Sequence, residues 1–122
     1  MATFSKEKLS GSTNGRGIAV VATATLGTTI HATGTSATIL DEIWLYANNI
    51  HSSAVTLTVE FGGATTTSDL IQISIPATPS GLYLVCGGLI LSGTGSAALT
   101  VTAFGSVASK IELFGFVNRI TP

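Results

Sequence analysis

The sequence predicts an all-β fold: an eight-stranded antiparallel sandwich, jelly-roll-like, that follows a flexible N-terminal arm. Charged residues make up only 9% of the chain, and much of it is Thr, Ser, Ala and Gly rather than the long straight side chains that helices favour. Apolar and polar residues alternate over short segments, and no segment repeats with helical spacing. Turn-forming residues separate these segments, which is the pattern of a sandwich.

The chain of 122 residues is long enough for one domain with one core. Residues 1–16 show no sustained period and end in a Gly/Ser-rich run, so we expect an arm there and a single β-sandwich over residues 17–122. Within that body, we expect strands at eight segments: 17–25, 28–33, 40–50, 54–62, 69–75, 82–91, 97–104 and 110–120.

Two of the segments predict which side chains face the core. In 54–62 the alternation places the side chains of Val55, Leu57, Val59 and Phe61 inside, and those of Thr56, Thr58 and Glu60 closer to water. In 40–50 the side chains of Asp41, Ile43 and Leu45 share one face, and those of Glu42, Trp44 and Tyr46 share the other. The single Cys86 lies in an alternating apolar stretch, and we expect it to be buried.

Charges are distributed unevenly along the chain. Residues 1–16 carry a net charge of +2, residues 17–109 hold four acidic side chains and no Lys or Arg, and the last thirteen residues carry +1. A body without basic side chains argues against a nucleic-acid partner, because phosphate binding requires Lys and Arg. It also indicates a surface that becomes covered, since an independent domain normally keeps its surface charged.

The first residues contain no apolar stretch of the length that a signal peptide needs, and the longest apolar run, 82–91, is too short to cross a membrane. We therefore expect no membrane partner. Catalytic chemistry is also not indicated: His31 and His51 are expected at a surface or interface and in a turn, and no nucleophile elbow is present. Spacings typical of metal ligands or phosphate loops are missing, so we predict no enzyme activity, no metal and no cofactor.

The aromatic residues are the best candidates for contacts. Trp44 and Tyr46 share a strand face, where they could stack on a sugar ring or pack in a protein interface. The segments 82–91 and 111–120 are apolar on both faces, although a sandwich strand needs only one apolar face, and a subunit interface would cover the other. The residues predicted for this interface are Trp44, Tyr46, Tyr83, Phe114 and Phe116.

Five segments resemble a group of small virion structural proteins of tailed bacteriophages: FSKEKLSGS (4–12), DEIWLYA (41–47), LTVEFGG (57–63), GLIL (88–91) and GFVNRI (115–120). The resemblance covers most of the chain and consists of short segments from predicted strands rather than a catalytic motif. It implies a virion component, of the type that decorates or cements the outside of a capsid.

The sequence and the resemblance together lead us to expect a capsid decoration protein, made in the host bacterial cytoplasm and located on the capsid surface. Its expected partners are further copies of itself, as a trimer, and the phage major capsid protein. The expected capsid-contact residues of the arm are Phe4, Lys6, Lys8, Leu9 and Arg16. Two alternatives remain open: a fibre or adhesin module that binds glycans, and a tail or neck structural protein.

Overall fold

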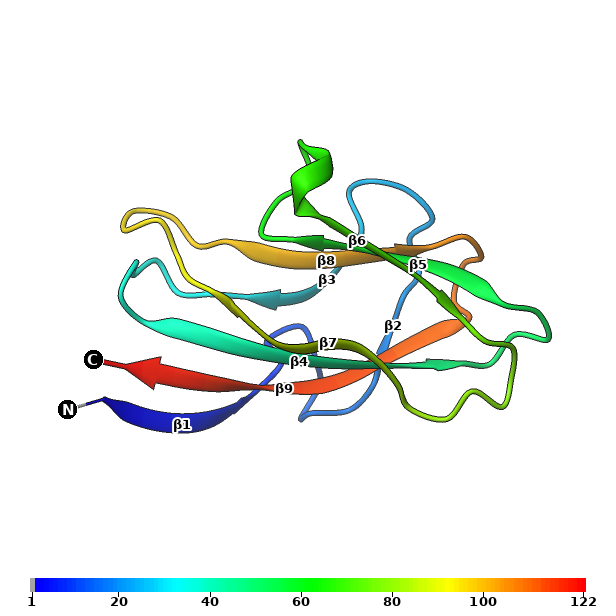
Figure 1. The fold of residues 1–122 in the computed structure, drawn as a ribbon, viewed down its shortest axis with the longest axis horizontal. Coiled ribbons are helices and arrows are strands. Elements are labelled where there is room, and N and C mark those ends of the chain that lie inside the picture. Colours follow the sequence, from blue (N-terminus) through cyan, green and yellow to red (C-terminus); the bar gives the residue numbers. More distant parts are fainter. Residues whose placement is uncertain (1) are drawn as a thin grey trace.

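The structure, a computed structural model that describes residues 2–122, confirms the β-sandwich (Figure 1). Within these residues the chain forms nine strands and one short 3-10 turn, η1 (Thr67–Asp69). The strands are β1 (Thr3–Lys8), β2 (Ile18–Ala19), β3 (Thr28–Ala32), β4 (Leu40–Asn49), β5 (Val55–Phe61), β6 (Leu70–Ile75), β7 (Tyr83–Leu91), β8 (Thr100–Gly105) and β9 (Ile111–Thr121).

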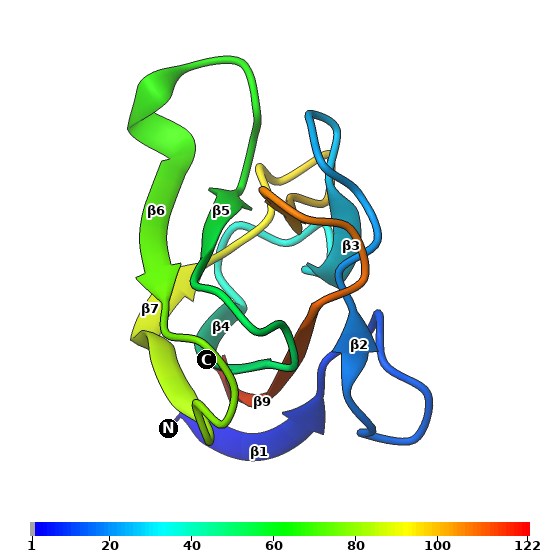
Figure 2. The same ribbon diagram turned by 90° about the vertical axis from the view of Figure 1, so that its right-hand side faces the viewer.

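The strands form two sheets, and all paired strands are antiparallel. Sheet A has the order β1-β9-β4-β7, with β2 also paired to β9, and sheet B has the order β3-β8-β5-β6. Figure 2 shows the two layers nearly end-on, with β6 and β7 together on one side and β2 on the other. Apart from β5 and β6, which follow one another in the chain, neighbouring strands are distant in sequence, so the chain crosses repeatedly between the sheets.

The predicted strand segments match the observed strands closely, except at 17–25. There only Ile18–Ala19 forms a strand, although Val20 still donates a backbone hydrogen bond to Ile111. The chain then leaves the sheet, because the hydroxyl of Thr28 accepts the backbone N–H groups of Val21 and Ala22. Residues 21–27 therefore form a loop over sheet B instead of a strand.

The expected flexible arm is wrong for residues 3–8. They form β1, which pairs with β9 from Thr3↔Thr121 to Lys8↔Phe116. The strand was missed because β1 is an edge strand with little burial, so its sequence lacks an apolar period. Leu9, expected to be free to bind a partner, is only 3% exposed and belongs to the core.

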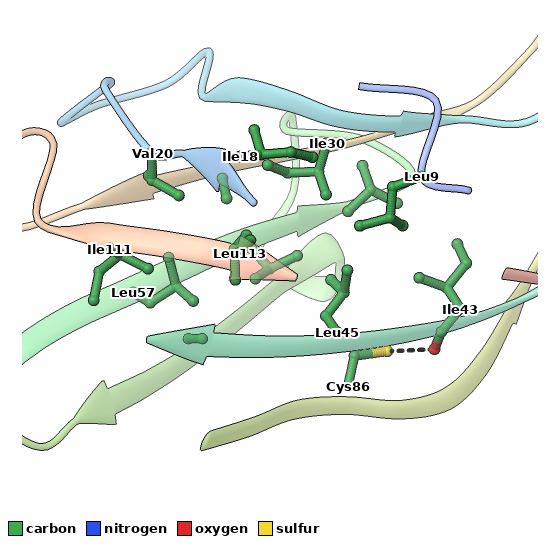
Figure 3. Packing of buried hydrophobic residues seen from close by; sticks show 14 of the residues in the cluster. Leu9, Ile18, Val20, Ile30, Ile43, Leu45, Leu57, Cys86, Ile111 and Leu113 are labelled. Carbon is green, nitrogen blue, oxygen red and sulfur yellow. Dashed lines mark hydrogen bonds between the residues drawn. The ribbon is translucent and has the colours of Figure 1, made fainter. Parts of the chain in front are cut away.

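The core fills the space between the sheets (Figure 3). As predicted, Val55, Leu57 and Val59 are buried within it, and so is Cys86. The largest fully buried apolar side chains are Ile30, Ile43, Leu45, Leu57, Ile75, Ile111 and Leu113.

The expectation that Thr58 and Glu60 lie near water is wrong. Their side chains do face away from the core, yet Thr58 is 2% exposed and Glu60 is fully buried. Thr58 accepts a hydrogen bond from the amide of Gln72 on β6, and Glu60 lies under the 21–27 loop. Alternation identified the core face of β5 correctly, but it carries no information about a loop that covers the opposite face.

One side of the sandwich is closed by residues 9–20. Leu9, Ile18 and Val20 are buried there, β2 pairs with β9 of sheet A, and the backbone of Gly11 donates to the carbonyl of Ile30 in sheet B. Figure 3 shows these side chains reaching into the core beside Ile30. This segment joins the two sheets along the β3 and β9 side.

Candidate functional site

The outer face of sheet A brings together four of the five residues predicted for a subunit interface. Trp44 and Tyr46 on β4 pair in register with Phe116 and Phe114 on β9. Side chains of paired residues share a face, and these four lie opposite the buried positions of their strands. All four are half-buried. We call this group the aromatic face.

The ring of Trp44 is held in place from several directions. It stacks on the ring of Phe116, with centroids 6.0 Å apart and planes 8° from parallel. Its Nε1–H donates to Oε1 of Glu42 at 2.8 Å, and Asn118 donates to the same oxygen at 3.0 Å. These hydrogen bonds lower the pKa of Glu42 below its ordinary value. The face is thus ordered before any partner binds.

Lys6 on β1 and Gly88 on β7 complete the surroundings of these rings. The Lys6 ammonium lies 4.8 Å from the centroid of Phe116, a favourable cation–π position. The backbone at Gly88, with φ of +84°, lies so close to Trp44 that an added Cβ would be 3.0 Å from the indole. Such a face can stack on planar groups or pack against a protein surface.

Tyr83, the fifth predicted interface residue, lies apart from the aromatic face. It begins β7 opposite buried Ala47, so it belongs to the other face of the sheet. On β7, Leu89 pairs with buried Ile43 and shares that face with Tyr83, whereas Leu84 and Ile90 pair with Tyr46 and Glu42 and lie beside the aromatic face. The structure therefore divides the predicted interface residues between two areas.

The predicted capsid-contact residues are also divided. Phe4 is 69% exposed, and Lys6 and Lys8 are exposed on β1, an edge strand of sheet A. Arg16 is exposed in the loop before β2, whereas Leu9 is buried in the core and is not available to a partner. Phe4, Lys6 and Lys8 thus form an ordered edge rather than part of a loose arm.

A buried polar network, which sequence reasoning missed, links the two sheets. Nε2 of His31 on β3 lies 2.8 Å from Oδ2 of Asp41 on β4, and both residues are 1% exposed. Arg119 on β9 donates from Nε to Oδ1 at 2.8 Å and from Nη2 to Oδ2 at 3.0 Å. The predicted surface or interface position for His31 is therefore wrong. Alternation placed Asp41 on the inner face, but the topology alone brings His31 to it.

The hydrogen-bond partners determine the protonation of this network. Nδ1 of His31 receives the backbone N–H of Ser10 at 3.0 Å, so it must act as an acceptor. The ring proton is then on Nε2 and is donated to Asp41. Burial alone would raise the pKa of Asp41, but the hydrogen bonds from Arg119 and His31, together with the charge of Arg119, outweigh it and lower the pKa.

A His–Asp pair is also part of a catalytic triad, but the geometry here differs. In a triad the second ring nitrogen faces the hydroxyl of a nucleophile. In this protein that nitrogen faces the backbone N–H of Ser10, while the Ser10 hydroxyl accepts the N–H of Ala32 at 2.7 Å. The network joins β3, β4 and β9 and ties the segment after β1 to them.

Glu60 forms a second buried carboxylate site. Its Oε1 accepts hydrogen bonds from the Thr102 hydroxyl at 2.6 Å and the Gly27 backbone at 2.8 Å, and its Oε2 accepts from the Thr25 hydroxyl at 2.8 Å. Burial would raise the pKa of Glu60, but these donors outweigh it and lower the pKa. Glu60 therefore fastens the 21–27 loop to sheet B.

Residues 2–122 contain no cluster of three or more His, Cys, Asp or Glu side chains suited to a metal ion. No pocket forms on their surface. None of the helical segments among them has the length and apolar character needed to span a membrane.

Comparison with known proteins found no family model, no curated protein and no solved structure that matches this chain.

Proposed function

We propose that this protein is a bacteriophage capsid decoration (cement) protein, which self-associates and binds the outside of the major capsid protein lattice. The observation that carries the proposal is the aromatic face of sheet A. An ordered surface with Trp44, Tyr46, Phe114 and Phe116 on neighbouring strands is typical of protein contact areas, where aromatic residues are enriched. The likeness of five segments to small phage virion proteins indicates which assembly this surface serves.

The fold supports the same proposal. The strand orders β1-β9-β4-β7 and β3-β8-β5-β6 favour the jelly-roll-like arrangement expected from the sequence. Double-sheet jelly rolls occur in viral capsid domains and also in lectins, so the fold alone does not select a function. The selection comes from the surface, where the aromatic face presents ordered rings with Lys6 and Glu42 beside them.

The mechanism is mechanical. A decoration protein buries surface across the seams between capsid subunits, so separating those subunits costs additional free energy. Many modest contacts repeated over a closed shell act together, because each bound copy keeps its neighbours close to their sites. Phe4, Lys6 and Lys8 on the exposed edge β1 provide apolar and basic contacts beside the aromatic face.

The decisive experiment adds purified protein to capsids that lack it and counts bound copies by quantitative mass spectrometry. A decoration protein saturates in proportion to the capsid lattice and raises the temperature at which the shells rupture. A matched pair of variants, Tyr46→Ala on the aromatic face and Thr29→Ala on exposed sheet B, locates the contact. Absence of binding to the shell, or a few copies at a single vertex, contradicts the proposal and favours a tail, neck or fibre location.

The second candidate function is glycan binding by a fibre or adhesin module. One observation favours it: Trp44 lies on an open sheet face with a carboxylate and an amide, Glu42 and Asn118, beside it. Aromatic rings flanked by polar groups suit the apolar and hydroxyl faces of a sugar. Titration with host-surface oligosaccharides, followed by the fluorescence of Trp44, the single Trp of the chain, tests this alternative.

A further inference from the structure

The two sides of the sandwich are closed to different extents. Residues 9–20 close the β3 and β9 side. On the opposite side, β6 is the edge of sheet B and β7 is the edge of sheet A, and no segment within residues 2–122 pairs with either free edge. Figure 2 shows β6 and β7 together on that side. We call it the β6/β7 side.

The core is incompletely covered there. Six apolar residues pack against the core while remaining partly exposed, and five of them lie on β6, on β7 or at the end of β5: Phe61, Ile71, Ile73, Val85 and Leu91. By contrast, the residues that close the other side, Leu9, Ile18 and Val20, are buried. The β6/β7 side therefore exposes apolar surface, whereas residues 9–20 cover the corresponding apolar surface on the opposite side.

β7 adds a concentrated apolar area to this side. Among the described residues, nine large apolar side chains are exposed, and five of them lie on β7 or at the position before it, in the two runs 82–84 and 89–90. These five are Leu82, Tyr83, Leu84, Leu89 and Ile90. Tyr83 and Leu89 pair with the inner-face residues Ala47 and Ile43, so they lie on the same face of β7 as the core residues, whereas Leu84 and Ile90 share the outer face with Tyr46 and Glu42. Exposed apolar side chains on a free edge strand favour association.

The charge pattern indicates the partner. Residues 70–109, which include all of β6 and β7, contain no Asp, Glu, Lys, Arg or His. Edge strands that must stay unpaired usually carry such charges. A charged partner would find no complementary group here, whereas a second copy presents the same neutral apolar surface. We infer that the β6/β7 side is where copies of this chain bind one another.

The contact is made mainly by side chains. β7 shifts register against β4 twice, between Ile43 and Trp44 and between Leu45 and Tyr46, and such bulges make a strand a poor template for a long new ladder. The two free edges belong to different sheets, so β6 of one copy can lie beside β7 of the other. Because the same side meets in both copies, the contact is isologous and closes as a two-fold dimer rather than as the trimer expected from the sequence. The inference rests on the self-association that is part of the proposed function.

Sedimentation equilibrium of the full chain, over a range of micromolar concentrations, tests the inference with three variants. Tyr83→Lys and Leu89→Lys place a charge on the β6/β7 side at positions that are 37% and 47% exposed in the monomer. Ile50→Lys is the matched control, 50% exposed in the loop after β4. We expect the wild type and the control to associate equally, and each β7 variant to raise the dissociation constant tenfold or more. Circular dichroism verifies that all three variants fold.

Hydrogen exchange provides a second measurement that needs no variant. Amides of β6 and β7 should gain protection as the wild-type concentration rises, while those of β1 stay unchanged. A wild type that remains monomeric, or equal dissociation constants for the β7 variants and the control, overturns the inference. Loss of association in the β7 variants supports this surface as the contact between copies, whatever the number of copies in the wild-type oligomer. A wild-type dimer would show only that the expected trimer is wrong. If the protein self-associates but fails to bind capsids, the proposed decoration function is overturned, and the inferred self-association surface is not.

Discussion

His31 and Asp41 are joined by a 2.8 Å hydrogen bond that crosses the sandwich from β3 in sheet B to β4 in sheet A. Asp41 also receives two hydrogen bonds from Arg119, so three donors surround one buried carboxylate. A buried charge with complete partners is costly to disturb, because removing one member leaves the others unsatisfied. This arrangement leads to the first prediction.

Asp41→Asn should lower the free energy of unfolding by about 3 kcal/mol, because the buried side chain loses the charge that Arg119 and His31 surround. Glu42→Gln is the matched control, since Glu42 lies next in the strand but on the outer face. Urea denaturation of both variants measures the difference. An equal loss in the two variants would show that burial of the network adds little stability.

The pH dependence of stability follows from the same carboxylates. The pKa values of Asp41 and Glu60 lie below their ordinary values of 3.8 and 4.5. Each folded-state carboxylate therefore stabilises the protein fully above its ordinary pKa, and this contribution is lost as the pH falls below that value toward the lowered one. We expect the melting temperature to fall on acidification below about pH 4.5, with a smaller drop in Glu60→Gln. A melting temperature that rises over this range would contradict the assignment.

Substitutions along β5 test which faces are covered. Leu57→Asp should abolish folding, because the residue is fully buried in the core. Thr58→Asp should be clearly destabilising, since Thr58 is buried and lies on the same strand face as Glu60. Thr56→Asp, at an exposed position, should change stability by less than about 0.5 kcal/mol. Thermal melts by circular dichroism rank the three variants by loss of stability. A small loss in Thr58→Asp would mean that this face of β5 is open to solvent.

Two truncations separate the edge strand from its anchor. Deleting residues 2–8 removes β1, whose side chains are mostly exposed, and should leave a folded protein. Deleting residues 2–12 also removes Leu9 from the core and the Ser10 hydrogen bonds to His31 and Ala32, and should severely destabilise it. Denaturation curves for the two proteins test this difference. Equal stability would show that the Leu9 anchor contributes nothing.

Gly88→Ala tests how closely β7 approaches the aromatic face. The substitution adds a Cβ at a positive φ and 3.0 Å from the Trp44 indole, so we expect a loss of about 1–2 kcal/mol and a shift in Trp44 fluorescence. Gly34→Ala is the control, because an added Cβ there has no heavy atom within 4 Å. If the control shifts the fluorescence equally, the effect does not arise from contact with Trp44.

The sequence by itself determined the strands β3 to β9 and the core faces of β4 and β5. Alternation identified the inner residues of β4 and β5, and placed Asp41 and Glu42 on opposite faces, because side chains in a strand point alternately to the two sides. It also identified Cys86 as buried, and it placed Trp44 and Tyr46 on the face of β4 opposite Ile43 and Leu45. These are local properties, which a single strand specifies without knowledge of its neighbours.

Only the tertiary structure decided which distant residues meet. His31 and Arg119 reach Asp41 because β3 and β9 happen to surround it, and Glu60 is buried because the 21–27 loop folds over it. Likewise, β1 is a strand because β9 offers it a free edge, although its own sequence lacks an apolar period. The physical reason is the same in each case: burial of these groups depends on a partner that is distant in sequence, and alternation along one strand carries no record of that partner.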